Sequence, residues 1–145
     1  MPKGTTSCNS LLNLWYRAVA WANIADNAAV APLVNVFVRL ATASYVATDV
    51  ATANEATFTN YVGGVAVART VGGWDAAAGG AIANTAAFEY PQCGASGNTI
   101  TSACTTSAAT GATIIWHYGD LNASIAVSNT IVIRFAAGAA TVTEA

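Results

Sequence analysis

The sequence has few charged residues for its length. Lysine, arginine, aspartate and glutamate make up 8% of the 145 residues, against about 25% in ordinary soluble domains. The five cationic residues stand singly, at Lys3, Arg17, Arg39, Arg69 and Arg134, and the formal net charge is −2. Because no basic run is present to neutralise phosphates, we expect no nucleic-acid partner.

The low charge raises the question of what covers the surface. Hydrophobic residues reach 54% of the chain, and many of them are alanines. A surface of small alanine and threonine side chains is one explanation, and burial of the surface by neighbouring subunits is the other. We favour the second explanation and expect a homo-oligomer.

The chain also lacks an uninterrupted apolar run of membrane-spanning length. Its most apolar region, 11–38, is broken by Arg17, Asp26 and Pro32, whereas a bilayer helix needs about 18 apolar residues or more. The early arginine makes the same region untypical of a signal peptide. We therefore expect no membrane partner and synthesis in a cytoplasm.

Groups that carry chemistry are scarce. The single histidine, His117, stands between Trp116 and Tyr118 in a β-rich run, so we expect a strand residue there and not a base or metal ligand. The segment Gly94–Asn98 lacks the second glycine of a nucleophile elbow, so Ser96 is interpreted as a turn residue. No phosphate loop or dinucleotide fingerprint is present. A carboxylate pair formed by folding, as in glycoside hydrolases, stays open. We expect no catalytic, cofactor-binding or metal residues and no enzyme activity.

The three cysteines are an odd number without metal-ligand spacing. Cys93 and Cys104 flank a candidate hairpin and could lie opposite each other, which would allow a disulfide. Synthesis in a reducing cytoplasm favours free thiols instead. Both states stay open, with thiols preferred.

The richest pattern is the last third of the chain, from Gly111 to Glu144. Four β-rich runs follow one another with turn residues between them: Ala112–Tyr118, Asn122–Val127, Thr130–Ala136 and Ala139–Glu144. The separators Gly119-Asp120, Ser128-Asn129 and Gly138 tolerate positive φ or bond to their own backbone. We expect a compact antiparallel meander here.

Further strands are expected upstream, at Leu33–Thr42, Tyr61–Thr70, Ala81–Tyr90 and Asn98–Thr106. In the first of them, one face consists of Val34, Val36, Val38 and Leu40, and we expect this valine face to lie in the core. Gly63-Gly64 suggests a bulge or a close backbone approach. Ala43–Asn60 has a weak pattern that indicates either a long loop or an excursion at the sheet edge.

The N-terminus begins with an arm, residues 1–10, of which the first six are polar. Ser7 or Asn9 could cap a helix that runs to about Asn23. Leu11, Trp15, Ala18 and Ala22 recur at helical spacing on that helix, with Leu12, Tyr16 and Val19 beside them, and we expect this apolar stripe to face the core. Residues 11–145 then form one domain. The fold class is all-β: an antiparallel β-sandwich or jelly-roll-like domain with one N-terminal helix.

Several segments resemble a known family in their linear order. They are LLNLWYR (Leu11–Arg17), VNVFVRLATA (Val34–Ala43), TNYVGGVAVART (Thr59–Thr70), NTAAFEYP (Asn84–Pro91), IIWHYGDL (Ile114–Leu121) and the closing IAVSNTIVIRFAAGAATVTE (Ile125–Glu144). Together they resemble small tailed-phage virion proteins, often labelled tail-fibre proteins, with some relatives thought to decorate the head. The segments 43–54 and 94–109 depart most from this pattern.

The resemblance implies a structural protein of the virion, made in the host cytoplasm. The main interpretation is a capsid decoration (cement) protein that binds between major capsid proteins as a homotrimer. The alternative is a tail-fibre or tail-tip component. A carbohydrate-binding module, with Trp74 and Trp116 as stacking platforms, is a third hypothesis from a different class.

Overall fold

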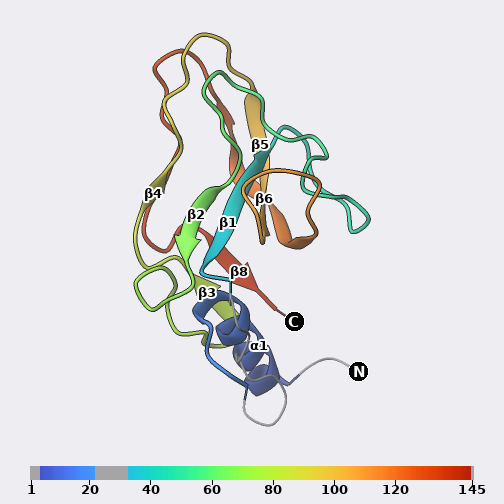
Figure 1. Cartoon of the computed structure of the whole chain (residues 1–145), viewed down its shortest axis with the longest axis vertical. Coiled ribbons are helices and arrows are strands. Elements are labelled where there is room, and N and C mark those ends of the chain that lie inside the picture. Colours follow the sequence, from blue (N-terminus) through green and yellow to red (C-terminus); the bar gives the residue numbers. More distant parts are fainter. Residues whose placement is uncertain (1–3, 22–32, 145) are drawn as a thin grey trace. The chain divides into compact units, whose positions relative to one another are not determined.

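A computed structural model of the chain describes residues 4–21 and 33–144 (Figure 1). Its elements are one helix and eight strands: α1 (Thr5–Arg17), β1 (Asn35–Ala41), β2 (Val65–Ala68), β3 (Ala81–Ala83), β4 (Phe88–Glu89), β5 (Thr99–Thr106), β6 (Ile115–Ala126), β7 (Arg134–Phe135) and β8 (Thr141–Thr143). The strand pairs are antiparallel where their register is defined. The predicted all-β antiparallel class with one N-terminal helix is confirmed.

The described residues form two compact units. The helix unit contains residues 4–21, 33–35, 67–88 and 135–144, and the sheet unit contains residues 36–66 and 89–134. Each unit is built from separate stretches of chain, with the division falling inside β1, β2, β4 and β7. The interpretation of 11–145 as one domain stays a prediction.

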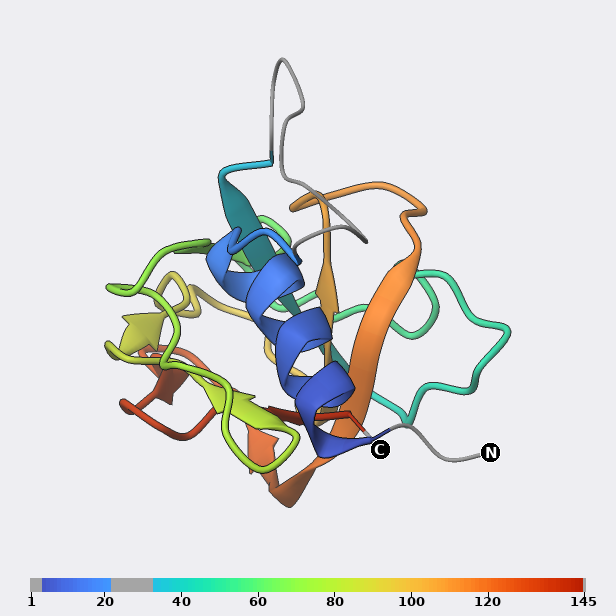
Figure 2. The same cartoon turned by 90° about the horizontal axis from the view of Figure 1, so that it is seen from below.

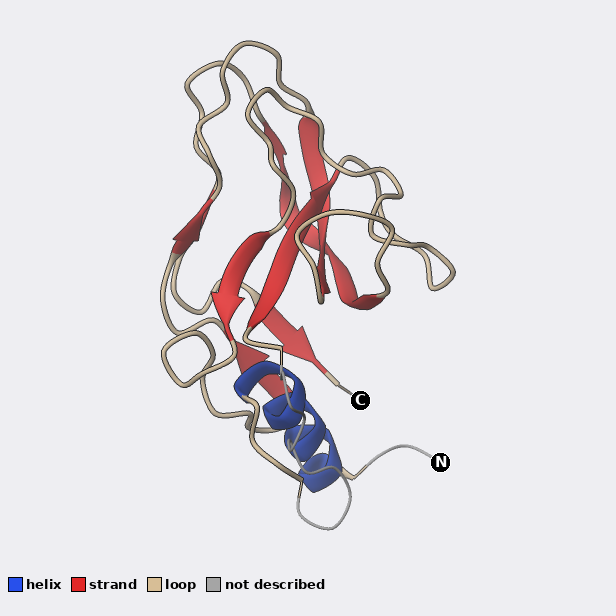
Figure 3. Cartoon of the chain, in the orientation of Figure 1, coloured by secondary structure: helices blue, strands red, loops and turns tan. Residues whose placement is uncertain are grey.

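A four-stranded sheet dominates the sheet unit, in the order β2-β1-β5-β6 (Figures 1 and 3). The predicted strands Leu33–Thr42 and Asn98–Thr106 correspond to β1 and β5. On β1, Val36, Val38 and Leu40 are buried, as the alternation predicted. Val34 stands before the strand begins and is exposed, so the predicted core face is buried only where it lies within β1.

β6 is longer and less regular than the two runs predicted in its place. Asp120 lies opposite Ser102 and Ile125 opposite Ile100, so residues 121–124 stand against Thr101 alone. These extra residues form a bulge directly after the predicted turn at Gly119-Asp120. The turn residues themselves belong to the strand.

The predicted C-terminal meander is wrong. β6 pairs with β5, β7 with β4, and β8 with β3, so strands far apart in the sequence come together. In the last pair, Ile82 lies opposite Val142, and both side chains are buried. Alternation identified most of these runs as extended, but pairing also depends on which distant apolar side chain covers each face.

Helix α1 starts earlier and ends earlier than predicted. Gly4 is its N-cap residue, and no side chain caps it, so the predicted caps Ser7 and Asn9 lie within the helix. Residues 5–10 of the predicted arm are therefore helical, and its first three residues lie outside the described range. Ala18 takes the left-handed conformation, φ 54°, and ends the helix after Arg17.

The buried face of α1 lies along one side of the predicted apolar stripe, the side with Leu12 and Tyr16. Cys8, Leu12 and Tyr16 are buried, whereas Leu11 and Trp15 are half-buried. The helix contacts β3 (Figures 1 and 2).

No helix among residues 4–21 and 33–144 is both long and apolar enough to span a bilayer.

Two buried polar side chains organise the helix unit. Arg69 donates to the carbonyls of Leu14 (2.6 Å), Leu33 (2.6 Å) and Trp15. Two of these carbonyls lie in the last turn of α1, where the helix dipole favours a cation. Burial lowers the pKa of this guanidinium. Asn84, fully buried, donates to Ala136 O at 2.8 Å and so holds the C-terminal segment.

Asn84 also marks where the predicted strand Ala81–Tyr90 divides. The structure has β3 at its start and β4 near its end, with Asn84 between them. The Asn84 side chain donates to Ala86 O at 2.8 Å, which turns the chain between the two short strands. Side-chain bonding of this kind competes with a continuous ladder.

Candidate functional site

The structure places the residues that suggested chemistry on different elements. His117 lies on β6 opposite Thr105 and is half-buried, which confirms its prediction as a strand residue. Within residues 4–21 and 33–144, no three histidine, cysteine or acidic side chains lie close enough to hold a metal ion. Ser96 lies in the loop between β4 and β5, where its backbone N–H bonds to Thr59 Oγ1 at 3.0 Å.

Trp74 is a core residue of the helix unit. Its side chain is fully buried, and its ring meets Tyr16 edge-on with centroids 4.6 Å apart. A buried ring cannot stack on a sugar, so this half of the carbohydrate-platform hypothesis is wrong. Trp116, the other proposed platform, is half-buried on β6.

The possible disulfide is absent. Cys93 and Cys104 are free and buried, as is Cys8. Cys104 on β5 lies opposite Arg39 and Tyr118, whereas Cys93 N donates to Ile131 O at 2.9 Å. Because β1 and β6 occupy both edges of β5 here, the segment with Cys93 cannot lie opposite Cys104. The preferred expectation of thiols is confirmed.

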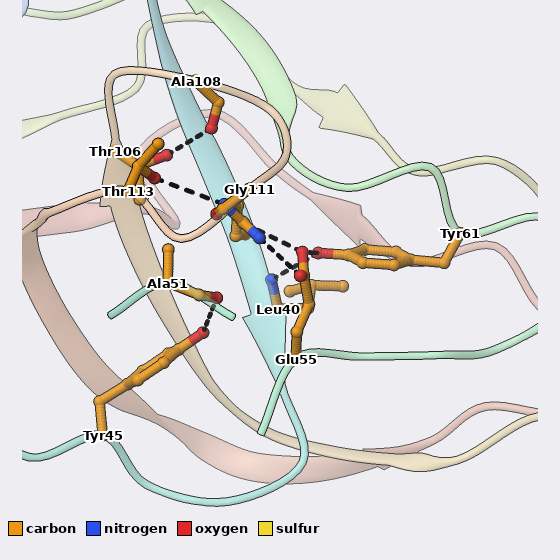
Figure 4. Close-up of polar contacts among 10 residues, drawn as sticks. Leu40, Tyr45, Ala51, Glu55, Tyr61, Thr106, Ala108, Gly111 and Thr113 are labelled. Atoms are coloured by element: carbon orange, nitrogen blue, oxygen red, sulfur yellow. Dashed lines mark hydrogen bonds and ion pairs between the residues drawn. The ribbon is translucent and has the colours of Figure 1, made fainter. Parts of the chain in front are cut away.

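The sheet unit is built around a buried ion pair. Arg39, fully buried on β1, donates from Nε to Glu55 Oε1 at 2.9 Å and from Nη2 to Oε2 at 2.5 Å. Its Nη1 donates to Gly111 O at 2.7 Å (Figure 4). One guanidinium thereby holds the 42–64 loop and the loop between β5 and β6 against the sheet.

Two tyrosines complete this attachment (Figure 4). Tyr61 Oη donates to Glu55 Oε1 at 3.3 Å and accepts from Leu40 N at 3.1 Å. Tyr45 Oη donates to Ala51 O at 3.3 Å. Burial raises the pKa of both phenols above its ordinary value. These bonds attach the 42–64 loop to the sheet at further points.

Close backbone approach at Gly63-Gly64, one of the two predicted possibilities, is confirmed. Gly63 has φ 96°, and a Cβ there would collide with the carbonyl of Ala109. A Cβ on Gly64 would lie 2.8 Å from Arg39 Cγ. These contacts bring the 42–64 loop against the ion pair.

The 42–64 loop and the first half of β6, with the residue before it, carry exposed apolar side chains and two acids. We call this the acidic–apolar surface: Val46, Val50, Ile114, Tyr118, Asp49 and Asp120. Val50 and Ile114 form an antiparallel bridge, and Ile114 is 77% exposed. Tyr118 is 48% exposed and lies edge-on to Tyr45 at 6.4 Å between centroids.

A second exposed apolar segment of the sheet unit carries a cation. We call it the basic–apolar surface: Ile131, Val132 and Arg134. Ile131 and Val132 are 39% and 42% exposed. Arg134 Nε lies 3.1 Å from Glu89 Oε1, in a pair whose side chains are 60% and 57% exposed. Such a pair is worth little, so the guanidinium can exchange its partner.

Both surfaces leave apolar side chains in contact with water, although burial of apolar area is favourable. Sequence reasoning missed both surfaces because alternation alone did not show which apolar side chains stay outside. The low overall charge was the one available indication.

Comparison with known families gives this arrangement a context. Residues 5–143 match the family described as podophage GP4 fiber I protein gp80. No curated protein sequence matches the chain. The chain belongs to that family, and it is a structural component of a phage virion. The resemblance to tailed-phage virion proteins is confirmed, and the family favours the tail-fibre alternative over capsid decoration.

Proposed function

We propose that the chain is a fibre-type component of the tail, working through contacts with copies of itself and with other virion proteins. The observation that carries this proposal is the family match over residues 5–143. It replaces capsid decoration, our main interpretation of the sequence, by the fibre alternative. No feature of the described residues favours decoration specifically.

The side chains of the sheet unit support a structural role. Its buried charges, Arg39 and Glu55, are used internally to fix a loop. Its exposed surface presents apolar groups that a neighbouring protein can cover. We propose that the protein acts by surface burial, without a cofactor or enzymatic step, and that its oligomer is a trimer.

The buried thiols fit synthesis in the host cytoplasm. Cys8, Cys93 and Cys104 are free, and a reducing compartment keeps cysteines in this state. Folding without a disulfide needs no oxidising step before the protein joins a particle.

Copy number in purified virions tests the proposal. Quantitative mass spectrometry should find a few copies per particle, with the protein in the tail fraction after heads and tails are separated. A copy number comparable with that of the major capsid protein, located in the head fraction, would support capsid decoration instead. Absence from washed particles would remove both roles.

A further inference from the structure

We infer that the acidic–apolar surface of one copy binds the basic–apolar surface of the next copy, in a head-to-tail contact. This inference rests on the proposed function, because it names the self-contact that a fibre component would use. Both surfaces belong to the sheet unit, and they share no residue. A chain can therefore offer one to each of two neighbours.

Charge decides which surfaces pair. The charged members of the acidic–apolar surface, Asp49 and Asp120, are both acidic. A symmetric contact of this surface with itself would bring like charges together, which is costly at an interface. Among the described residues of the sheet unit, the exposed side chain of opposite charge is Arg134. Arg39, the other cation of this unit, is fully buried in its pair with Glu55.

Apolar side chains accompany the charges on both sides. Val50 and Ile114 on one surface would cover Ile131 and Val132 on the other, removing apolar area from water. Arg134 needs only to exchange the exposed carboxylate of Glu89 for one from the neighbouring copy. No buried ion pair has to be broken.

The geometry of such a contact limits the assembly. A contact between two different surfaces leaves one of each free on every pair, so chains add until a ring closes. A twofold dimer would instead use one surface twice. The proposed trimer is a closed ring of this kind.

Charge reversal in the full chain tests the pairing. Purified wild-type protein should sediment as a closed oligomer, measured by analytical ultracentrifugation over a range of concentrations. Asp120→Arg and Arg134→Asp should each raise the dissociation constant by about 10-fold or more, because each places like charges opposite one another. Combining them should restore most of the affinity.

Complementation distinguishes head-to-tail from symmetric contact. Ile114→Asp and Val132→Asp should each give monomers, and an equimolar mixture of the two should give a species of two chains, joined by their intact surfaces. The matched control Val71→Asp, at a 70% exposed position in the helix unit, should leave assembly unchanged. Circular dichroism of each variant verifies its fold.

Three results would overturn the inference. They are a monomeric wild type at high concentration, a double reversal that fails to restore assembly, and a mixture that stays monomeric. If these occur while virions carry the protein in their tails, the fibre role stands and this contact falls. If virions lack the protein but the reversals behave as stated, the fibre role falls and the contact stands.

Discussion

Arg39 and Glu55 are joined by two parallel hydrogen bonds, 2.9 Å and 2.5 Å long, although 16 positions separate them in the sequence. The guanidinium is fully buried and the carboxylate side chain is 20% exposed. A buried cation is tolerated only when its partners are held in place. The ion pair therefore ties the long loop that supplies Glu55 to the strand that supplies Arg39.

Breaking this pair should destabilise the protein strongly. Glu55→Gln leaves Arg39 buried without a counter-charge, and we expect a loss of about 3 kcal/mol in the free energy of unfolding. Replacing both, as Arg39→Met with Glu55→Leu, should cost less than the single change, since no charge stays buried. Urea denaturation measures each value.

The control for this pair is the exposed one. Glu89→Gln removes the carboxylate beside Arg134 and should cost less than about 1 kcal/mol, because water solvates both groups. Equal losses for Glu55→Gln and Glu89→Gln would contradict the importance of burial.

Substitution of Gly63 should be costly. Gly63→Ala places a Cβ against the Ala109 carbonyl at a φ of 96°. Strain and displacement together should lower stability by about 1–3 kcal/mol. Gly119→Ala is the matched control, because a Cβ there meets nothing within 4 Å. A melting temperature that falls equally for both would argue against the close approach.

The thiols should be unreactive in the folded protein. Cys8, Cys93 and Cys104 are buried and free, and burial raises the pKa of Cys104 above its ordinary value. A thiol reagent should label none of them rapidly in native protein and all three in denaturant. Fewer than three groups in denatured, unreduced protein would reveal a disulfide.

Stability should fall at alkaline pH. Burial raises the pKa of Tyr61 and Tyr90 above the ordinary value of 10.0. Between the unfolded and folded pKa values, the folded state binds more protons than the unfolded state. The stabilisation is therefore complete below pH 10 and is lost as the pH rises above it.

Denaturation between pH 8 and 11 measures this slope. Tyr90→Phe should lower stability at every pH, since it removes the 2.7 Å bond to Val38 O, and should also flatten the alkaline slope. An unchanged slope would show that another group controls the transition.

Local pattern predicted much of the fold. The strands β1 and β5 were found within two residues of their ends, because alternation of apolar side chains reports one buried face directly. The glycine pair at 63–64 was read correctly as a possible close approach, since glycine alone fits backbone against backbone.

What the sequence did not reveal depends on distant partners. Arg39 follows the pattern of an outward residue, and only Glu55, folded back from a loop, makes its burial possible. The start of α1 was misplaced because Gly4 offers no capping side chain to recognise. The candidate surfaces were missed because local alternation does not show which apolar side chains a distant segment will cover. Ile114, for example, is 77% exposed in the folded chain.

The bulge in β6 has a consequence for how the protein behaves at high concentration. β6 lies at the end of the hydrogen-bonded order of its sheet, where an intact ladder could recruit further strands without limit. The four residues 121–124 bend this edge out of register, so an added strand would lose its hydrogen bonds after a few residues. We therefore expect little edge-to-edge association through β6 even in concentrated solutions of the protein.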